Sequence, residues 1–281
     1  MYLGTHARKR PDHPALIMAG SGETISYGEL DARSNRLAQL FYARGLRPGD
    51  HVAIFTENHP VFFDAMWAAF RSGLYWTPIN SHLTPDEAAY IASDCGARAL
   101  ITTTTLGEAA AALVARAPLE IRLMADTGGA LVSGYERYED AVAVHPPTPL
   151  ADEREGWQMM YSSGTTGRPK GILPPLPDLR PGDPHPLADS SRNLFGFGED
   201  TIYLSPAPLY HAAPSVTSSI VQRWGGTVVC MERFDAEQCL ACIERYRITQ
   251  AQFVPTMFVR MLKLPEAVRR RYDVSSLRLA Q

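Results

Sequence analysis

A run of glycines and hydroxyl-bearing residues that ends in a lysine stands out between residues 161 and 171. It reads Tyr-Ser-Ser-Gly-Thr-Thr-Gly-Arg-Pro-Lys-Gly and follows a short apolar stretch. Glycines let backbone N–H groups approach an anion closely, and successive N–H groups can form a concave anion site. Hydroxyls donate hydrogen bonds to phosphate oxygens, and a lysine adds a compact positive charge. The run therefore predicts a loop that holds a polyphosphate through Ser162, Ser163, Gly164, Thr165, Thr166, Gly167 and Lys170.

Two better-known phosphate motifs do not fit this run. A Walker A loop needs glycine before its lysine and serine or threonine after it, whereas Pro169 and Gly171 flank Lys170 here. The Gly-x-Gly-x-x-Gly fingerprint of dinucleotide-binding folds is also missing from the run. An unliganded surface loop rich in glycine and serine would not require the Pro-Lys-Gly ending.

The run resembles the signature loop of AMP-forming adenylating enzymes, which include acyl-CoA synthetases, luciferases and the adenylation domains of peptide synthetases. Residues 162–171 match the pattern Ser/Thr-Gly-Thr-Thr-Gly-x-Pro-Lys-Gly throughout. Weaker matches follow in the family's order along the whole chain, at residues 24–30, 76–84, 208–211 and 254–257. The chain is thus similar to the N-terminal portion of an AMP-forming acyl-CoA synthetase.

The resemblance implies a two-step reaction that uses ATP, Mg²⁺ and coenzyme A. A carboxylic acid, fatty or aryl, is joined to AMP with loss of pyrophosphate, and a thiol then captures the acyl group. The amides of Gly164, Thr165 and Gly167 would hold the β- and γ-phosphates, and Lys170 would supply charge to the departing pyrophosphate. Fixed donors matter because two anions must meet in the first step.

His211 and Thr256 are the candidates for the acid-binding side. The resemblance implies that His211 is a gate or wall of the acyl pocket, and a structural histidine at a helix terminus is the alternative. Thr256 would line the same pocket, or would cap the helix that follows it. The polar or proline-rich surroundings of His6, His13 and His185 predict that these histidines lie at the surface.

The elements that position these residues alternate between helical and extended patterns. Helices are predicted at residues 27–44, 60–71, 84–95, 106–116, 212–223, 236–246 and 256–263, and strands at 51–55, 74–78, 98–101, 120–124, 201–204, 227–230 and 250–254. This rhythm predicts an α/β fold with mostly parallel sheets flanked by helices. The resemblance implies two βα subdomains, one of residues 51–197 and one of residues 1–50 with 198–281.

Residues 169–186 interrupt the rhythm because they contain seven prolines. Proline fixes φ and lacks an N–H donor, so the segment predicts an exposed extended loop with neither helix nor central strand. The next helix would begin near residues 189–191, or the site beside the phosphates is remodelled.

Composition excludes several classes of protein. A net charge of −3 does not indicate the positively charged surface that binds nucleic acid. No run of apolar residues is long enough for a transmembrane helix. The N-terminus does not read as a signal peptide, and four cysteines suit a reducing compartment, so a cytoplasmic location is expected. Cys239 and Cys242 share one face of a predicted helix without a second metal-binding pair, which favours buried thiols over a zinc site and leaves no predicted metal ligands.

The resemblance implies further segments that follow these in members of the family and that do not occur in residues 1–281. They are the adenine-binding turn, the Tyr-Gly-x-Thr-Glu run, the ribose-binding aspartate and the C-terminal domain with its catalytic lysine. We therefore expect a truncated product or fragment without a complete catalytic set, inactive by itself. The alternatives are an adenylation domain that loads a carrier protein, and a catalytically dead remnant that serves as a binding module. An open sheet edge and an uncovered apolar face would favour a homo-oligomer.

Overall fold

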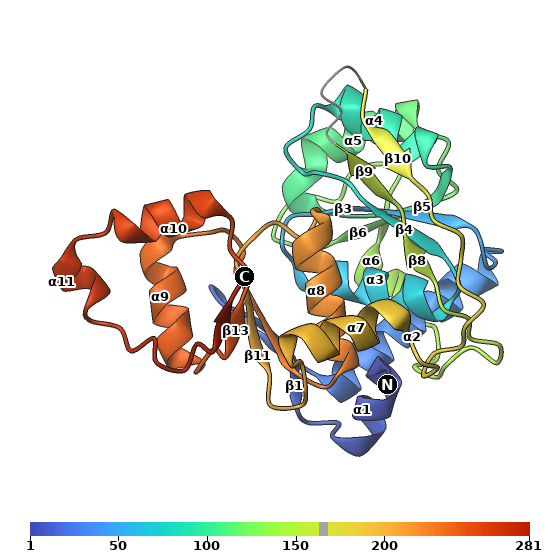
Figure 1. The fold of residues 1–281 in the computed structure, drawn as a ribbon. Coiled ribbons are helices and arrows are strands. Elements are labelled where there is room, and N and C mark those ends of the chain that lie inside the picture. The colour runs from blue at the N-terminus through green and yellow to red at the C-terminus, as the bar shows by residue number, and fades with distance from the viewer. Residues whose placement is uncertain (163–167) are drawn as a thin grey trace. The chain divides into compact units, whose positions relative to one another are not determined.

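The chain folds into two compact units in a computed structural model that describes residues 1–162 and 168–281 (Figure 1). Unit 1 comprises residues 1–29 and 184–281, and unit 2 comprises residues 30–183. The sequence analysis placed these divisions near residues 50 and 197. Much of the difference between the predicted and the observed boundaries arises because most of helix α2 (Tyr27–Ala43) belongs to unit 2. Within unit 2, Arg33 pairs with Asp64 at 2.9 Å and Asp31 pairs with Arg71 at 2.6 Å.

Unit 2 is built around a six-stranded parallel sheet with the order β7-β6-β5-β3-β4-β8. In Figure 1, helices α4 and α5 cover one face of this sheet and helices α3 and α6 the other. A separate antiparallel pair joins β9 to β10. Besides α2, the elements are β3 (His51–Phe55), α3 (Pro60–Arg71), β4 (Tyr75–Pro78), α4 (Pro85–Asp94), β5 (Ala97–Thr103), the 3₁₀ turn η1 (Thr104–Leu106), α5 (Gly107–Arg116), β6 (Ile121–Ala125), β7 (Glu136–Arg137), α6 (Tyr138–Ala143), β8 (Trp157–Gln158), β9 (Met160–Ser162) and β10 (Lys170–Ile172).

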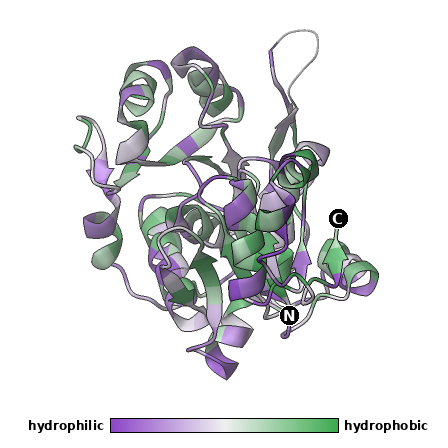
Figure 2. Cartoon of the chain, turned by 90° about the vertical axis from the view of Figure 1, so that its left-hand side faces the viewer, coloured by the Kyte–Doolittle hydropathy of each residue, from purple (hydrophilic) through white to green (hydrophobic). Residues whose placement is uncertain are grey.

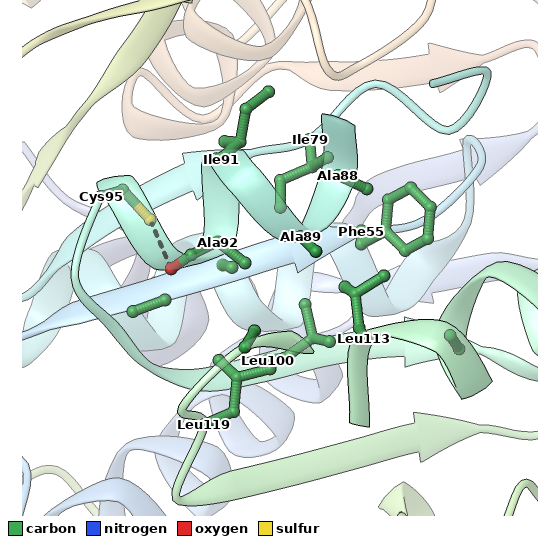
Figure 3. Packing of buried hydrophobic residues seen from close by; sticks show 14 of the residues in the cluster. Phe55, Ile79, Ala88, Ala89, Ile91, Ala92, Cys95, Leu100, Leu113 and Leu119 are labelled. Carbon is green, nitrogen blue, oxygen red and sulfur yellow. Dashed lines mark hydrogen bonds between the residues drawn. The ribbon is translucent and has the colours of Figure 1, made fainter. Parts of the chain in front are cut away.

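The core between α4, α5 and the sheet of unit 2 is closely packed with aliphatic and small residues. Figure 3 shows Phe55 of the sheet near Ala88 and Ala89 of α4 and Leu113 of α5. Thr84 and Glu87 form the predicted capping box, which fixes the start of α4. Burying both faces of a parallel sheet in this way is typical of βαβ chains.

Unit 1 contains a second six-stranded sheet with the order β14-β13-β11-β12-β1-β2, in which only β1 and β2 are antiparallel. Helices α9 and α10 pack on it through Cys239, Ile243 and Met257. The elements are α1 (Leu3–Lys9), β1 (Pro14–Met18), β2 (Thr24–Ser26), α7 (Pro186–Phe195), β11 (Ile202–Ser205), α8 (Ala212–Arg223), β12 (Thr227–Cys230), α9 (Ala236–Arg245), β13 (Gln250–Ala251), α10 (Pro255–Leu262), α11 (Glu266–Arg269) and β14 (Leu279–Ala280). Many helices in Figure 2 carry a hydrophobic and a hydrophilic side, as amphipathic helices on a sheet should.

The predicted α/β class with two mainly parallel sheets is confirmed. As predicted, the proline-rich segment contains no central strand, and the helix that follows it begins only at Pro186. Residues 170–172 form strand β10 within it, since a two-stranded hairpin at the surface does not need the donors that a central strand needs. Helix α7 begins at Pro186 rather than near residue 189. Proline is favoured at the first position of a helix, where its missing N–H would have no partner anyway.

Candidate functional site

The predicted phosphate loop is carried by the β9–β10 hairpin of unit 2. Ser162 and Lys170 lie directly opposite each other in the antiparallel register, and the Ser162 hydroxyl donates to the Lys170 carbonyl at 3.4 Å. Both residues are exposed. The residues between them that the sequence analysis singled out lie outside the described residues; they are Ser163, Gly164, Thr165, Thr166 and Gly167. The hairpin thus brings together the two ends of the predicted loop.

The other face of the hairpin rests on helix α4. Side chains alternate along a strand, so Tyr161, which is paired with Gly171, points away from the face that carries Ser162 and Lys170. The Tyr161 hydroxyl donates to Asp94 at 2.6 Å, and burial together with this bond raises the pKa of Tyr161. A Cβ on Gly171 would lie 2.4 Å from Met159 Cε, the end of a flexible side chain.

Arg168 and Pro169 connect the far end of the loop to the same helix. The Arg168 guanidinium lies 5.0 Å from the ring centroid of Tyr90, and the Tyr90 hydroxyl donates to the Pro169 carbonyl at 3.4 Å. These residues line a hollow of about 440 Å³ together with Asp86 and Glu87 at the start of α4. Helix α4 thus supplies Tyr90 and Asp94 as contacts for both ends of the predicted loop, which the sequence motif alone did not reveal.

The exposed face of the hairpin has the chemistry of an anion site. An ammonium group and a hydroxyl stand opposite each other at the mouth of a loop whose sequence is rich in glycine and threonine. Such groups fit the oxygens of a polyphosphate. In the part of the chain that the structure describes, no group of three histidine, cysteine, aspartate or glutamate side chains could hold a metal ion.

The acid-side candidates both belong to unit 1, at the starts of two helices. His211 occupies the N-cap position of α8 without a side-chain capping bond, and its ring lies 4.5 Å from that of Tyr210. His211 is exposed at the surface, yet partial desolvation lowers the pKa of its imidazole. Thr256 lies in the first turn of α10 and is exposed; the N-cap there is Val254, which has no capping side chain, so the alternative role of Thr256 as the cap is wrong.

Two histidines that were predicted at the surface are buried. His6 is fully buried, and its Nε2 lies 3.1 Å from the carbonyl of Arg223. His185 caps α7 by accepting the N–H of Ala188 at 3.2 Å, and only 6% of its surface is exposed. Local polarity misled the prediction, because contacts with residues distant in sequence decide burial. Cys239 and Cys242 are buried thiols in the core of unit 1, as predicted.

Comparison with known proteins decides the family. Residues 3–281 match the AMP-binding enzyme family. This chain belongs to the AMP-binding enzymes. A feruloyl-CoA synthase of an Amycolatopsis species is 32% identical over 272 residues, which are 96% of this chain and 51% of the relative. A 4-coumarate–CoA ligase of Humulus lupulus is 30% identical over 280 residues, 95% of this chain and 49% of the relative.

A solved structure supports the fold of this AMP-binding enzyme chain. The N-terminal domain of FACL13 from Mycobacterium tuberculosis is 24% identical and superposes with a TM-score of 0.78, over 99% of this chain and 67% of that domain. This similarity confirms two mainly parallel sheets flanked by helices. The chain spans about half the length of the curated relatives it matches. No helix in residues 1–162 or 168–281 is long and apolar enough to cross a membrane.

Proposed function

We propose that this chain is the ATP-binding portion of an ATP-dependent carboxylic acid–CoA ligase. The observation that carries the proposal is the pairing of Ser162 with Lys170 at the mouth of the signature loop. Membership of the AMP-binding enzymes supports the use of ATP. The relatives named above act in the CoA activation of aryl acids, which favours an aryl acid over a fatty acid as the substrate.

The first chemical step would be the attack of the acid's carboxylate oxygen on the α-phosphorus of ATP. A new P–O bond forms, the bond to the bridging oxygen breaks, and pyrophosphate leaves with its electron pair. Lys170 would hold the oxygens of the departing pyrophosphate, and the Ser162 hydroxyl would turn from the Lys170 carbonyl to donate a hydrogen bond to the same group. Mg²⁺, when bound with ATP, would neutralise phosphate charge. The residues of this chain thus bind and orient the phosphates.

The capture of the acyl group by coenzyme A would follow, with loss of AMP. His211 and Thr256, at the starts of α8 and α10, are proposed to border the acid pocket. His211 would serve there as a wall, since the lowered pKa of its imidazole keeps the ring neutral near pH 7. A neutral ring avoids placing a second charge beside the carboxylate substrate.

Pyrophosphate binding tests the proposal directly in the 281-residue chain. Lys170→Met should weaken the affinity for magnesium pyrophosphate at least tenfold in isothermal titration, because it removes the charge opposite Ser162. Lys263→Met is a matched control, since Lys263 is also an exposed lysine but follows α10 in unit 1. Equal affinities of the two variants for pyrophosphate would overturn the role of Lys170.

Catalysis gives a second test. The isolated chain should not support ATP–pyrophosphate exchange with an aryl acid, because it spans about half of its relatives' length. In a longer protein that contains this chain, Lys170→Met should lower the exchange rate by on the order of 10²–10³. Exchange by residues 1–281 alone would refute the expected inactivity, and unchanged exchange in the longer variant would refute the assignment of the loop.

A further inference from the structure

Unit 2 contains a cavity of about 540 Å³ that the proposed reaction does not use. It lies between the end of α2, the turn before β3, the end of α3 and the segment 149–152. Apolar side chains form most of its wall, among them Phe41, Leu46, Leu74 and Leu150. Neither Ser162 nor any other residue of the β9–β10 hairpin lines it. Its size falls within the range of small-molecule sites.

The wall of this cavity is held in place by backbone and side-chain contacts. The N–H of Gly49 donates to the carbonyl of Gly73 at 2.8 Å, which joins the turn before β3 to the end of α3. A Cβ on Gly73 would lie 3.0 Å from Pro48, so the two segments are in close contact. Gln39 Nε2 donates to the carbonyls of Thr148 and Pro149 at 2.8 and 3.2 Å, which fixes the opposite wall.

Arg47 presents unused donors at the cavity. Its Nη1 donates to the carbonyls of Tyr42 and Leu46 at 2.9 and 2.8 Å, and its guanidinium lies 4.1 Å from the centroid of the Tyr42 ring. In the described ranges of the chain, its Nε and Nη2 have no partner. Asp152, which also lines the cavity, is engaged by Arg154 and Arg180 at 3.5 and 3.6 Å. Arg47 is therefore the cation that remains available to a ligand.

We propose that this cavity binds a small aromatic carboxylate. The ring would lie among the apolar side chains, and the carboxylate would accept hydrogen bonds from Nε and Nη2 of Arg47, which form the planar edge that suits a carboxylate. The inference is independent of the proposed function, because the cavity shares no residue with the phosphate loop, His211 or Thr256.

The test uses benzoate as the probe, with saturable binding to the 281-residue chain followed by ligand-observed NMR. Arg47→Gln should weaken binding at least tenfold, and Leu150→Trp should abolish it by filling the cavity. Arg116→Gln is the matched control, because it removes an exposed arginine of α5 that does not line the cavity. Benzamide, which has the same ring without the negative charge, should bind more weakly than benzoate to the unaltered chain.

Binding that persists in both Arg47→Gln and Leu150→Trp would place the probe elsewhere and overturn the proposal, as would the absence of saturable binding. Because Arg47 is exposed, its variant should fold normally, and circular dichroism checks this independently.

Discussion

Gly156 occupies a position where no side chain fits. An added Cβ would lie 2.3 Å from the carbonyl oxygen of Leu74 and 2.4 Å from that of Ala69, and both are backbone atoms that cannot move aside. Gly156→Ala should therefore lower the free energy of unfolding by about 3 kcal/mol or more. Urea denaturation measures the change.

Gly107→Ala provides the control for this prediction. A Cβ at Gly107 would lie 3.5 Å from Val132, which is an ordinary contact, and the residue begins α5 with helical φ. The substitution should raise the free energy of unfolding by about 0.4–1 kcal/mol by restricting the unfolded chain. If both substitutions changed the free energy of unfolding by the same amount, the inference that residue 156 is closely packed would be wrong.

The four cysteines allow a prediction about reactivity. All are buried, and burial raises the pKa of Cys95 and Cys242 to about 11 and that of Cys239 to about 12. Since the thiolate is the reactive form, the native chain should react with a thiol reagent at pH 8 far more slowly than the urea-unfolded chain. Fast labelling of a native cysteine, identified by mass spectrometry, would contradict this burial.

Helix α7 depends on a neutral histidine at its start. Burial, assisted by the nearby charge of Arg223, lowers the pKa of His185 to about 4, and its ring accepts the N–H of Ala188. Between pH 6.5 and 4 the unfolded chain takes up a proton that the folded chain resists, so stability falls as the pH falls. The loss from this group is about 3 kcal/mol at most and ends below pH 4.

His185→Asn should remove this part of the pH dependence, because asparagine accepts the same capping bond without titrating. Free energies of unfolding at pH 7.5 and 4.5 should therefore differ less in this variant than in the unaltered chain. His211→Asn changes an exposed N-cap histidine and should leave most of the difference in place. Equal pH dependence in all three proteins would refute the role of His185.

The elements that local signals define were predictable from the sequence. Residues 212–223 and 227–230 form a helix and a strand with the predicted bounds, because apolar periodicity and flanking glycines specify them. The short strand β10 was missed because, among the described residues, it pairs with β9 alone, and such pairing leaves no periodic signal in three residues. The burial of His185 was missed because it depends on tertiary packing.

The candidate site was predictable only in part for the same reason. The predicted phosphate loop consists of consecutive residues, so Ser162 and Lys170 could be proposed from the sequence. The contact of Tyr161 with Asp94 joins residues far apart in the chain, and no local pattern indicates it. The cavity beside Arg47 likewise depends on four separate segments of unit 2.

At the scale of the whole molecule, unit 1 exposes an apolar surface beside an open sheet edge. The surface comprises Val254, Phe258, Val259 and Leu262 on and beside α10. Strand β14 has one neighbour, β13, in the part of the sheet that the structure describes. Such surfaces favour association, so the purified chain should form larger species as its concentration rises.

Phe258→Glu should reduce this association in light scattering coupled to size exclusion. Val144→Glu is the control, because Val144 is an equally apolar and more exposed residue that belongs to unit 2. A chain that stays monomeric at every concentration, or two variants with the same behaviour, would contradict a role for the α10 surface.

The strand order of unit 2 has a consequence for synthesis on the ribosome. The central strand β3 can pair with β4 and β5 soon after they emerge, whereas the edge position beside β4 belongs to β8, which is made only after β5, β6 and β7. The hairpin with Ser162 and Lys170 follows directly after β8. The nascent sheet must therefore keep one edge unoccupied until nearly all of unit 2 has been translated.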